Sequence, residues 1–199
     1  MKINPTIQTI DTDFSKGRLI HIQTITLEDT AKFHGHLCDG LVVGFLGLRE
    51  ALYLLYPSKI IDRTNTRVVS KSSPCITDVG VYLTGGRYQF DTFYVDDSIS
   101  YLYIIQRVDN GLTYGLKLKT GIKPSIIEQM GNKAIEGKLS SFELDDLKKM
   151  EEDFTDKLLA SNSSTLFDID KIENFAWQPV LDNKFIKTDV LKKNVTNTK

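Results

Sequence analysis

The stretch LVVGFLGLREALYLL, residues 41–55, is the most apolar part of the sequence and decides how the rest of the chain is organised. Arg49 and Glu50 interrupt it, and it falls short of the roughly 20 apolar residues that a membrane span needs. It therefore predicts a buried core helix in a protein that does not cross a membrane. We expect Asp39 to cap this helix at its N-terminus and Pro57 to end it.

Three glycines on this helix indicate that something packs closely against it. They recur at spacings of four and three, which places Gly40, Gly44 and Gly47 on one helical face. Each glycine costs about 1 kcal/mol relative to alanine in a helix interior. The spacing favours a face that another backbone approaches closely, rather than three glycines that are merely tolerated.

The clearest strand signals lie in the middle of the chain. Residues 101–105 are rich in strand formers, and Asp109-Asn110-Gly111 supplies a tight turn before the chain returns along 112–119. Residues 67–71 predict a further short strand, whereas 78–83 fit a helix and a strand equally well by periodicity. The sheet is therefore expected to contain an antiparallel hairpin.

Helices are expected on either side of these strands. Thr26 is placed to cap a short helix over 28–33, and Ser140 with Glu143 forms a capping box ahead of an amphipathic helix whose apolar face would begin at Phe142. Helices and strands are mixed without a repeating β–α–β order. We therefore predict an α+β fold, with a mixed or antiparallel sheet, the buried glycine-bearing helix and flanking helices.

The chain is expected to form one domain with two short additions. Residues 1–160 would form the domain, opened by a loosely structured lead-in over 1–20. Residues 161–186, which contain Trp177, would form a C-terminal extension that packs back on the domain. Residues 187–199 are polar and lysine-rich, and we expect a flexible tail there.

Composition excludes several classes of partner. The chain has 199 residues with 25 Lys+Arg against 26 Asp+Glu, and this balance gives no basic surface for a nucleic acid. Its two cysteines, Cys38 and Cys75, are too few for a secreted disulfide scaffold. The N-terminus lacks a basic start followed by an apolar segment, so we expect no signal peptide and a cytoplasmic protein.

The densest chemistry lies immediately before the core helix, in Phe33-His34-Gly35-His36-Leu37-Cys38-Asp39-Gly40. Imidazole and thiol groups are ligands for zinc and its neighbours in the transition series. In a helix His34 and Cys38 would share a face without His36, whereas in an extended segment all three would lie on one side. The two glycines favour a bent loop between two helices, with His36 and Cys38 as the main pair of ligands.

A segment this short does not easily supply a whole tetrahedral shell, so we expect a further ligand from elsewhere. Cys75, in Pro74-Cys75-Ile76-Thr77-Asp78, is the candidate. Three protein ligands plus a water or substrate would make an open, catalytic-type site, and Asp78 would orient a histidine or accept a proton from bound water. Two alternatives remain open, because the cysteines also suit ordinary buried positions or a redox-active disulfide.

These residues resemble the signature of a known family. Residues 33–40 are similar to Phe-His-Gly-His-x-Cys-Pro-Gly, the usual form in the FmdE family, which takes its name from formylmethanofuran dehydrogenase. A second family element, Cys-x-x-Asp followed by Leu-Thr-Gly, stands here as Cys75–Asp78 and Leu83-Thr84-Gly85. The resemblance covers about residues 25–135 and marks 1–160 as an FmdE-like domain.

The resemblance implies an α+β domain that binds a transition metal, most often thought of as zinc, in a cleft. It also implies a homodimer, with which the glycine-bearing helix face is compatible. Asp78 and Thr84 would line the metal pocket. The metal ligands that it implies are His36, Cys38 and Cys75, with His34 next.

Three departures from the family pattern bear on function. Asp39 replaces the usual proline and adds a carboxylate beside the metal. Gly86 stands where a cysteine often follows Leu-Thr-Gly, so any role of that thiol is absent. Many members carry a C-terminal zinc ribbon with paired Cys-x-x-Cys motifs, which a chain with two cysteines cannot form.

Three functions remain open. In a small metal-dependent enzyme, Asp78 would act as a catalytic residue on zinc-bound water. Thr84 and Arg87 would bind an anionic group of a small substrate. A tight turn also explains the sequence Thr84-Gly85-Gly86-Arg87. In a non-catalytic metal or cofactor carrier, or accessory subunit, the protein would serve a partner oxidoreductase. In a plain scaffold, the thiols and histidines would be structural.

Overall fold

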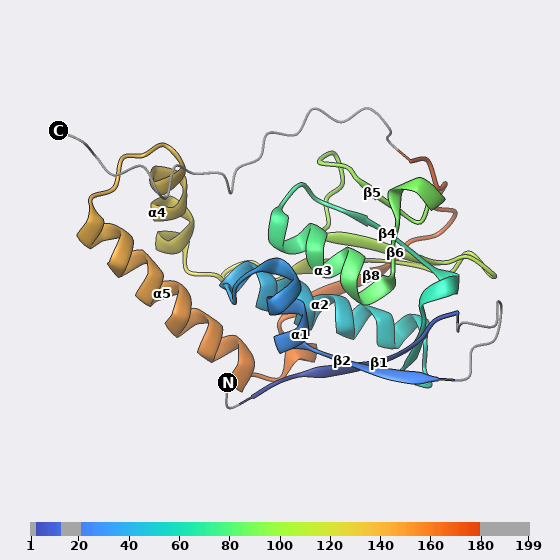
Figure 1. Ribbon diagram of the computed structural model, residues 1–199. Coiled ribbons are helices and arrows are strands. Elements are labelled where there is room, and N and C mark those ends of the chain that lie inside the picture. The colour runs from blue at the N-terminus through green and yellow to red at the C-terminus, as the bar shows by residue number, and fades with distance from the viewer. Residues whose placement is uncertain (1–2, 13–20, 180–199) are drawn as a thin grey trace.

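The computed structural model describes residues 3–12 and 21–179. Within them the chain forms five α-helices and two sheets, which confirms the predicted α+β class (Figure 1). The helices are α1 (Leu27–His34), α2 (Asp39–Leu55), α3 (Pro74–Thr84), α4 (Ser125–Ile135) and α5 (Ser141–Ala160). The strands are β1 (Thr6–Ile10), β2 (Ile22–Thr26), β3 (Ile60–Asp62), β4 (Thr66–Ser70), β5 (Phe93–Val95), β6 (Tyr103–Arg107), β7 (Thr113–Leu118) and β8 (Phe167–Lys171).

The larger sheet has the strand order β5-β4-β6-β7-β8 and covers one side of the core. Strands β4 and β5 are parallel, and every other neighbouring pair in it is antiparallel. The predicted hairpin is confirmed, because β6 and β7 pair antiparallel. Gly111 in the connecting turn has φ 71°, a left-handed conformation that glycine adopts without the clash of a Cβ.

The smaller sheet, with the order β2-β1-β3, shows that the prediction of a loosely structured lead-in was wrong for residues 6–10, while residues 13–20 of that segment lie outside the described residues. Strand β1 pairs antiparallel with β2 and parallel with β3. Its residues alternate between exposed and buried up to Thr9, and Ile7 is 1% exposed. The sequence TIQTI does not itself alternate between apolar and polar residues, because the second buried position is Thr9. The signal that the sequence interpretation missed is its four β-branched Thr and Ile residues, which favour strands.

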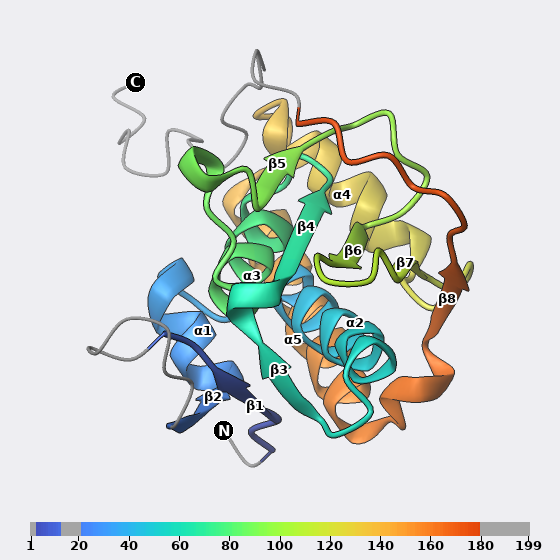
Figure 2. The ribbon, with the colours of Figure 1, turned by 90° about the vertical axis from the view of Figure 1, so that its right-hand side faces the viewer.

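Helix α2 lies at the centre of the molecule and packs against α3, α5 and strands β6 and β7 (Figures 1 and 2). It ends at Leu55, ahead of Pro57, as predicted. Its N-cap is Cys38 rather than the predicted Asp39. The reason is local: Cys38 has extended backbone angles, and its Sγ accepts a hydrogen bond from the Leu41 N–H at 3.4 Å.

The glycine face of α2 packs against other elements of the same chain. A Cβ at Gly40 would lie 3.1 Å from Cys75 Sγ, and a Cβ at Gly44 would lie 2.9 Å from Tyr103 Oη. A Cβ at Gly47 would lie 2.7 Å from a phenylalanine ring of β8. The glycines therefore admit α3, β6 and β8, and this face lends no support to a dimer, which stays a prediction.

The remaining helices begin where local signals place them. The ambiguous segment 78–83 is helical, as part of α3, and Pro74 lies in the first turn, where its missing N–H costs nothing. Thr26 caps α1 and Ser140 caps α5, each through a capping box. Phe142 does not join the buried face of α5, since it is 81% exposed.

The described C-terminal segment lies against the larger sheet (Figure 2). Strand β8 pairs antiparallel with β7 and forms the edge of that sheet. Trp177 packs edge-on against Tyr94, with the ring centroids 4.8 Å apart, and its Nε1 donates to the Asp91 carbonyl at 2.9 Å. Residues 180–186 of the expected extension and the expected tail over 187–199 lie outside the described residues.

No described helix combines the length and the hydropathy that a membrane crossing requires.

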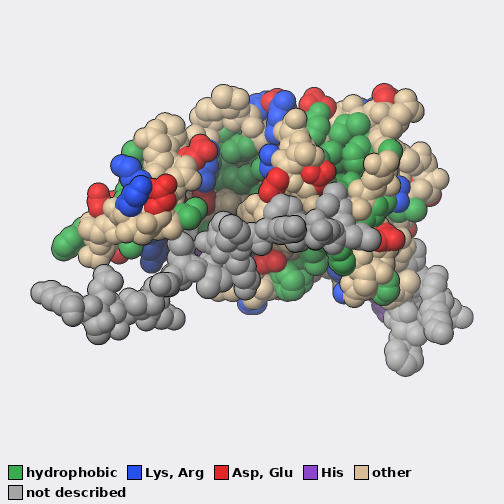
Figure 3. Space-filling view, turned by 90° about the horizontal axis from the view of Figure 1, so that it is seen from above, with side chains coloured by type: hydrophobic (Ala, Val, Ile, Leu, Met, Phe, Trp, Pro, Cys, Tyr) green, Lys and Arg blue, Asp and Glu red, His purple; other side chains and the backbone are tan. Residues whose placement is uncertain are grey.

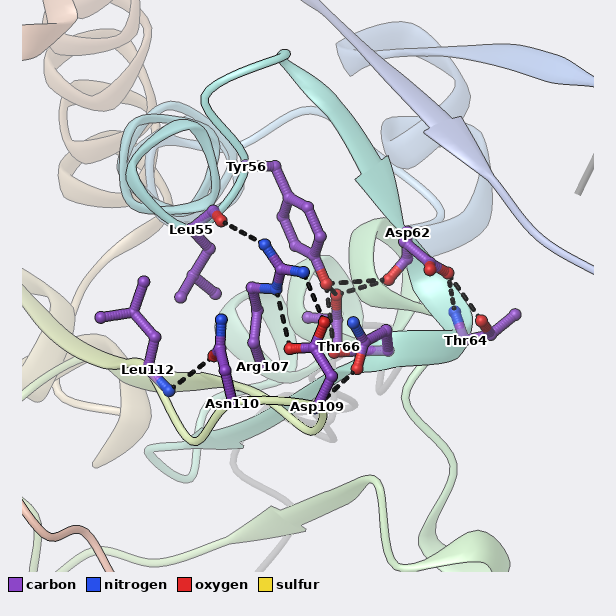
Figure 4. Close-up of polar contacts among 10 residues, drawn as sticks. Leu55, Tyr56, Asp62, Thr64, Thr66, Arg107, Asp109, Asn110 and Leu112 are labelled. Carbon is purple, nitrogen blue, oxygen red and sulfur yellow. Dashed lines mark hydrogen bonds and ion pairs between the residues drawn. The ribbon is translucent and has the colours of Figure 1, made fainter.

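A polar cluster holds the C-terminal end of α2 (Figure 4). Tyr56 Oη lies 2.8 Å from Thr66 Oγ1 and 3.1 Å from the Asn65 carbonyl oxygen. Arg107 Nη1 donates to the Leu55 carbonyl at 3.4 Å, and its guanidinium lies 4.8 Å from the Tyr56 ring centroid. A cation and a hydrogen-bond donor at a helix C-terminus stabilise carbonyls that have no partner within the helix. This cluster fixes one end of α2, and the candidate site lies at the other.

Replacing Tyr56 by phenylalanine is expected to lower the free energy of unfolding by about 1–2 kcal/mol. Thr66 is 1% exposed and loses a hydrogen-bond partner, while the ring and its contact with Arg107 remain. Urea denaturation measures the change. Tyr53→Phe is the control, because its hydroxyl contacts a single carbonyl at 3.4 Å and an effect below about 0.5 kcal/mol is expected. Equal losses in the two variants would contradict the prediction.

Candidate metal centre

The loop that carries the candidate ligands connects the end of α1 to the start of α2. His34 is the last residue of α1, and Gly35 caps the helix with φ 106°, its N–H donating to the Ala31 carbonyl at 2.9 Å. The left-handed conformation of Gly35 reverses the chain, and α2 begins after Cys38. The segment is thus the bent loop between two helices that the sequence predicted.

Three side chains of this loop converge. Ligand atoms of His34, His36 and Cys38 all lie within 4.8 Å of one another. Cys38 Sγ is 3.9 Å from His34 Nε2, and the centroids of the two imidazole rings are 4.7 Å apart. The bend at Gly35 brings all three side chains together, so the segment is neither a continuous helix nor a flat strand.

Cys75 reaches this cluster from the first turn of α3. Its Sγ lies 3.3 Å from Cys38 Sγ, and both cysteines are free. A disulfide would require about 2.05 Å between the sulfurs. Gly40 permits the approach, because a Cβ there would lie 3.1 Å from Cys75 Sγ. The structure therefore places His34, His36 and Cys38 in one group of potential ligands, while Cys75 lies outside that group and contacts it through Cys38.

The two thiols share a proton, which favours a thiolate on Cys38. The hydrogen bond from Cys75 lowers the pKa of Cys38 from 9.0 to about 7, and the Leu41 N–H also stabilises its thiolate. The same hydrogen bond and burial raise the pKa of Cys75. Helices α2 and α3 both begin here, and the positive ends of their dipoles favour negative charge at this point. The thiolate is the form that ligates a metal.

Asp78 orients the most buried of the histidines. Its Oδ2 lies 2.8 Å from His34 Nδ1, and the His34 side chain is 5% exposed. With the proton on Nδ1 donated to this carboxylate, the lone pair of Nε2 is directed toward Cys38. Carboxylates hold metal-binding histidines in this way and increase their basicity. Asp78 lies one helical turn after Cys75, which is why Cys-x-x-Asp places both at the same site.

The negative charge of Asp39, which stands at the usual proline position, is paired with a lysine. Its Oδ2 lies 2.7 Å from Lys123 Nζ, and its Oδ1 accepts the Gly40 N–H at 2.8 Å. A carboxylate in the first turn of a helix is favoured by the helix dipole. The substitution therefore links the loop to the segment before α4, and it adds no unpaired charge beside the thiols.

Thr84 and Arg87 are not brought to the cluster. They follow Cys75 at the opposite end of α3, about 13 Å or more along the helix axis. Thr84 is fully buried, with its hydroxyl donating to the Gly80 carbonyl at 2.6 Å. The N–H groups expected to cradle an anion already have acceptors. Gly85 N–H donates to Val81 O, Gly86 N–H to Thr84 Oγ1 and Arg87 N–H to Thr92 Oγ1.

A cleft of about 730 Å³ opens beside the cluster, between the loop and the arm formed by α4 and α5. His36, Leu37 and Cys38 line one wall, and residues of both arm helices line the other. Figure 3 shows a hollow between this arm and the body, with hydrophobic side chains at its base. Sequence reasoning recognised α5 as amphipathic but did not place it here, because periodicity identifies an apolar face and not what that face adjoins.

Substituting Asp78 by asparagine is expected to weaken metal binding about 10- to 100-fold. Asparagine keeps the size and can still accept the Nδ1 proton of His34, but it lacks the charge that makes the imidazole more basic. Competition with a chromophoric chelator measures the affinity. Asp145→Asn, on the exposed surface of α5, is the control. Unchanged affinity in Asp78→Asn would show that the carboxylate does not act through His34.

Comparison with known proteins assigns the chain to a family. A search of curated proteins gave no match. The family model described as "FmdE, Molybdenum formylmethanofuran dehydrogenase operon" matches residues 33–168. The match starts at Phe33 and continues past the limit of about 135 that the motifs indicated, so that it includes α4 and α5. It spans more than half of the chain and begins with the loop that carries the candidate ligands, and this protein therefore belongs to the FmdE family.

Proposed function

We propose that this protein binds one zinc ion through the side chains gathered between α1, α2 and α3, and that the open side of the site acts on a small molecule in the adjoining cleft. The observation that carries the proposal is the convergence of His34, His36 and Cys38, whose ligand atoms lie within 4.8 Å of one another. Cys75, with its Sγ 3.3 Å from Cys38 Sγ, adds a second thiol. Imidazole and thiolate together are the donor set of tetrahedral zinc sites.

The donor spacings around Cys38 come close to those of such an ion, whereas the overall spread of up to 4.8 Å among the ligand atoms of His34, His36 and Cys38 would need a larger side-chain movement. With bonds of about 2.3 Å to sulfur and about 2.0 Å to nitrogen, tetrahedral geometry separates two sulfurs by roughly 3.8 Å, and sulfur from nitrogen by roughly 3.5 Å. Here Cys38 Sγ lies 3.3 Å from Cys75 Sγ and 3.9 Å from His34 Nε2. Both distances differ from the tetrahedral values by about 0.5 Å, which small side-chain rotations can supply.

The residues of the site would have different parts in this function. Zinc in such a site lowers the pKa of a bound water to about 7 and polarises a substrate carbonyl or phosphoryl group. His34 is buried and held by Asp78, and Cys38 is fixed as the cap of α2. His36 is exposed and lines the cleft, so it is the ligand whose movement would open or close a coordination position.

Metal analysis of protein purified without an affinity tag or chelator tests the proposal. We expect about one zinc per chain, and after replacement by Co²⁺ an absorption band from thiolate-to-metal charge transfer. Added azide should change the visible d–d bands if a coordination position is exchangeable. Protein that holds no metal and gives no cobalt spectrum would overturn the proposal. A cobalt spectrum that azide leaves unchanged would overturn its open, catalytic part and favour a closed structural site.

A carrier or accessory subunit for an oxidoreductase is the second candidate, and one observation favours it. Phe33 and Leu37, on either side of the histidines, are 52% and 42% exposed. Phe33 also stacks on Tyr82, with ring centroids 5.1 Å apart. Exposed apolar side chains around a metal site suit docking to another protein. A carrier should transfer its zinc to a chelating indicator within seconds, whereas an enzyme should retain the ion for hours.

Homodimerisation stays a prediction that light scattering can test.

A further inference from the structure

The cleft beside the metal cluster has two unlike walls. One wall is the ligand loop, through His36, Leu37, Cys38 and Asp39. The other is the α4–α5 arm, whose lining residues on α4 are Gly131, Ala134 and Ile135. The volume of about 730 Å³ lies in the range of sites for small organic ligands. The cleft is thus large enough for a molecule that extends well beyond the metal.

The α5 wall is a stripe along one helical face. Its lining residues recur every three or four positions, and they are Leu144, Leu147, Lys148, Glu151, Glu152, Thr155 and Asp156. From Leu144 to Asp156 this stripe is about 18 Å long. The cleft is therefore a trough beside α5, and the ligand loop faces it from the other side.

Polarity changes along the trough. At the end near the α4–α5 turn, the wall is apolar, with Ile135 50% and Leu144 45% exposed. At the other end it carries Glu151, Glu152 and Asp156. Lys148, the only lysine of the α5 wall, lies 3.8 Å from Glu152 and offsets one of these three negative charges. Asp39 across the trough is paired with Lys123. An exposed apolar end and an acidic end lie in one cavity.

The charge of α5 as a whole strengthens this polarity. Residues 141–160 carry seven aspartates and glutamates against three lysines, although the whole chain has a net charge of -1. Asp156 lies in the last turns of α5, where the negative end of the helix dipole adds to the attraction for a cation. A site in which two thiolates hold Zn²⁺ has no net charge, so it would not offset the negative electrostatic potential of α5.

We infer that the cleft binds an amphipathic cation: a molecule with a positively charged amine at the Glu152–Asp156 end and an apolar body along Leu144 and Ile135, beside the metal cluster. This inference rests on the proposed function, since it names the class of small molecule that the metal would meet. It is carried by the shape of the cleft, its apolar end and its acidic end. An anionic molecule of the same length meets the same apolar surface but is repelled by the carboxylates.

Three probes of equal length test the inference: hexylammonium, hexanol and hexanoate. Their dissociation constants are measured by NMR titration of ¹⁵N-labelled full-length protein, both metal-free and zinc-loaded. At low salt we expect hexylammonium to bind about tenfold more tightly than hexanoate, with hexanol between them, and the ratio to fall in 0.5 M NaCl. The shifted resonances should include α5 and the loop 36–39.

Matched variants separate charge from apolar contact. The double substitution Glu152→Gln with Asp156→Asn should remove the preference for hexylammonium and leave hexanol binding unchanged. Asp145→Asn with Asp153→Asn, which changes two exposed α5 carboxylates outside the cleft lining, should preserve the preference. Leu144→Ala should weaken all three probes.

Two outcomes would overturn the inference: hexanoate binding as tightly as hexylammonium, or both double variants behaving alike. Because the three probes are also compared in metal-free protein, the result for the ligand class does not depend on the proposed zinc site. Protein that binds no zinc but keeps the preference would refute the proposed function alone. Protein that binds zinc but shows no preference would refute the ligand class alone.

Discussion

Cys38→Ser is expected to reduce bound transition metal to near zero, while the protein remains folded. Cys38 contacts both neighbouring ligands, since its Sγ lies 3.3 Å from Cys75 Sγ and 3.9 Å from His34 Nε2. Serine is a poor ligand for zinc but one of the best N-cap residues, so its hydroxyl can still accept the Leu41 N–H that Cys38 accepts. Metal per chain, measured by plasma mass spectrometry, gives the loss directly.

The control measurements keep fold and metal binding apart. Far-UV circular dichroism of metal-free Cys38→Ser should match that of metal-free wild type, because the cap of α2 is retained. Wild type should gain thermal stability on addition of zinc, whereas Cys38→Ser should not. Cys75→Ser should also lose binding, although it leaves the three loop residues in place. Full zinc stoichiometry in both variants would refute the site and leave the thiols as ordinary structural groups.

Gly44→Val is expected to destabilise the protein by about 3 kcal/mol or to prevent folding. A Cβ at Gly44 would lie 2.9 Å from Tyr103 Oη and 3.3 Å from side-chain atoms of α3. Tyr103 cannot move aside easily, because it is fully buried and its hydroxyl donates to the Ile76 carbonyl at 2.6 Å. Urea denaturation of wild type and variant measures the loss, or shows that no cooperative transition remains.

Gly131→Ala in α4 is the matched control, and its effect should have the opposite sign. Nothing lies within 4 Å of a Cβ at Gly131, so alanine adds no clash there. Helix propensity then favours alanine by about 1 kcal/mol. A Gly44→Val variant as stable as wild type would show that the space between α2 and β6 is not filled as the structure has it.

The parts of the fold that were predictable depend on residues near one another in the sequence. The Asp109-Asn110-Gly111 turn, the cap at Thr26 and the capping box at Ser140 are satisfied within a few residues, so local sequence specifies them. The bent loop was predictable for the same reason, because Gly35 readily adopts the left-handed conformation that ends α1. Cys-x-x-Asp likewise places Asp78 one turn from Cys75 once α3 is a helix.

The parts that were missed depend on distant partners. Asp39, the predicted N-cap of α2, lies instead in its first turn and pairs with Lys123, a residue far along the chain. The anion cradle at Thr84–Arg87 is absent because its N–H groups find acceptors in α3 and at Thr92. The glycine face of α2 was predicted to admit another backbone, but the atoms that approach it are side chains, including those of α3, β6 and β8.

The sequence by itself determined which residues can bind a metal and that three of them share a short bent segment, because side-chain chemistry and glycine conformation are local properties. Only the tertiary structure decided that Cys75 lies 3.3 Å from Cys38 and that Asp78 holds His34. Only it placed the acidic and apolar face of α5 across a cleft from that loop. The physical reason is that packing around α2 sets the distances between segments far apart in the chain, and no local pattern encodes those distances.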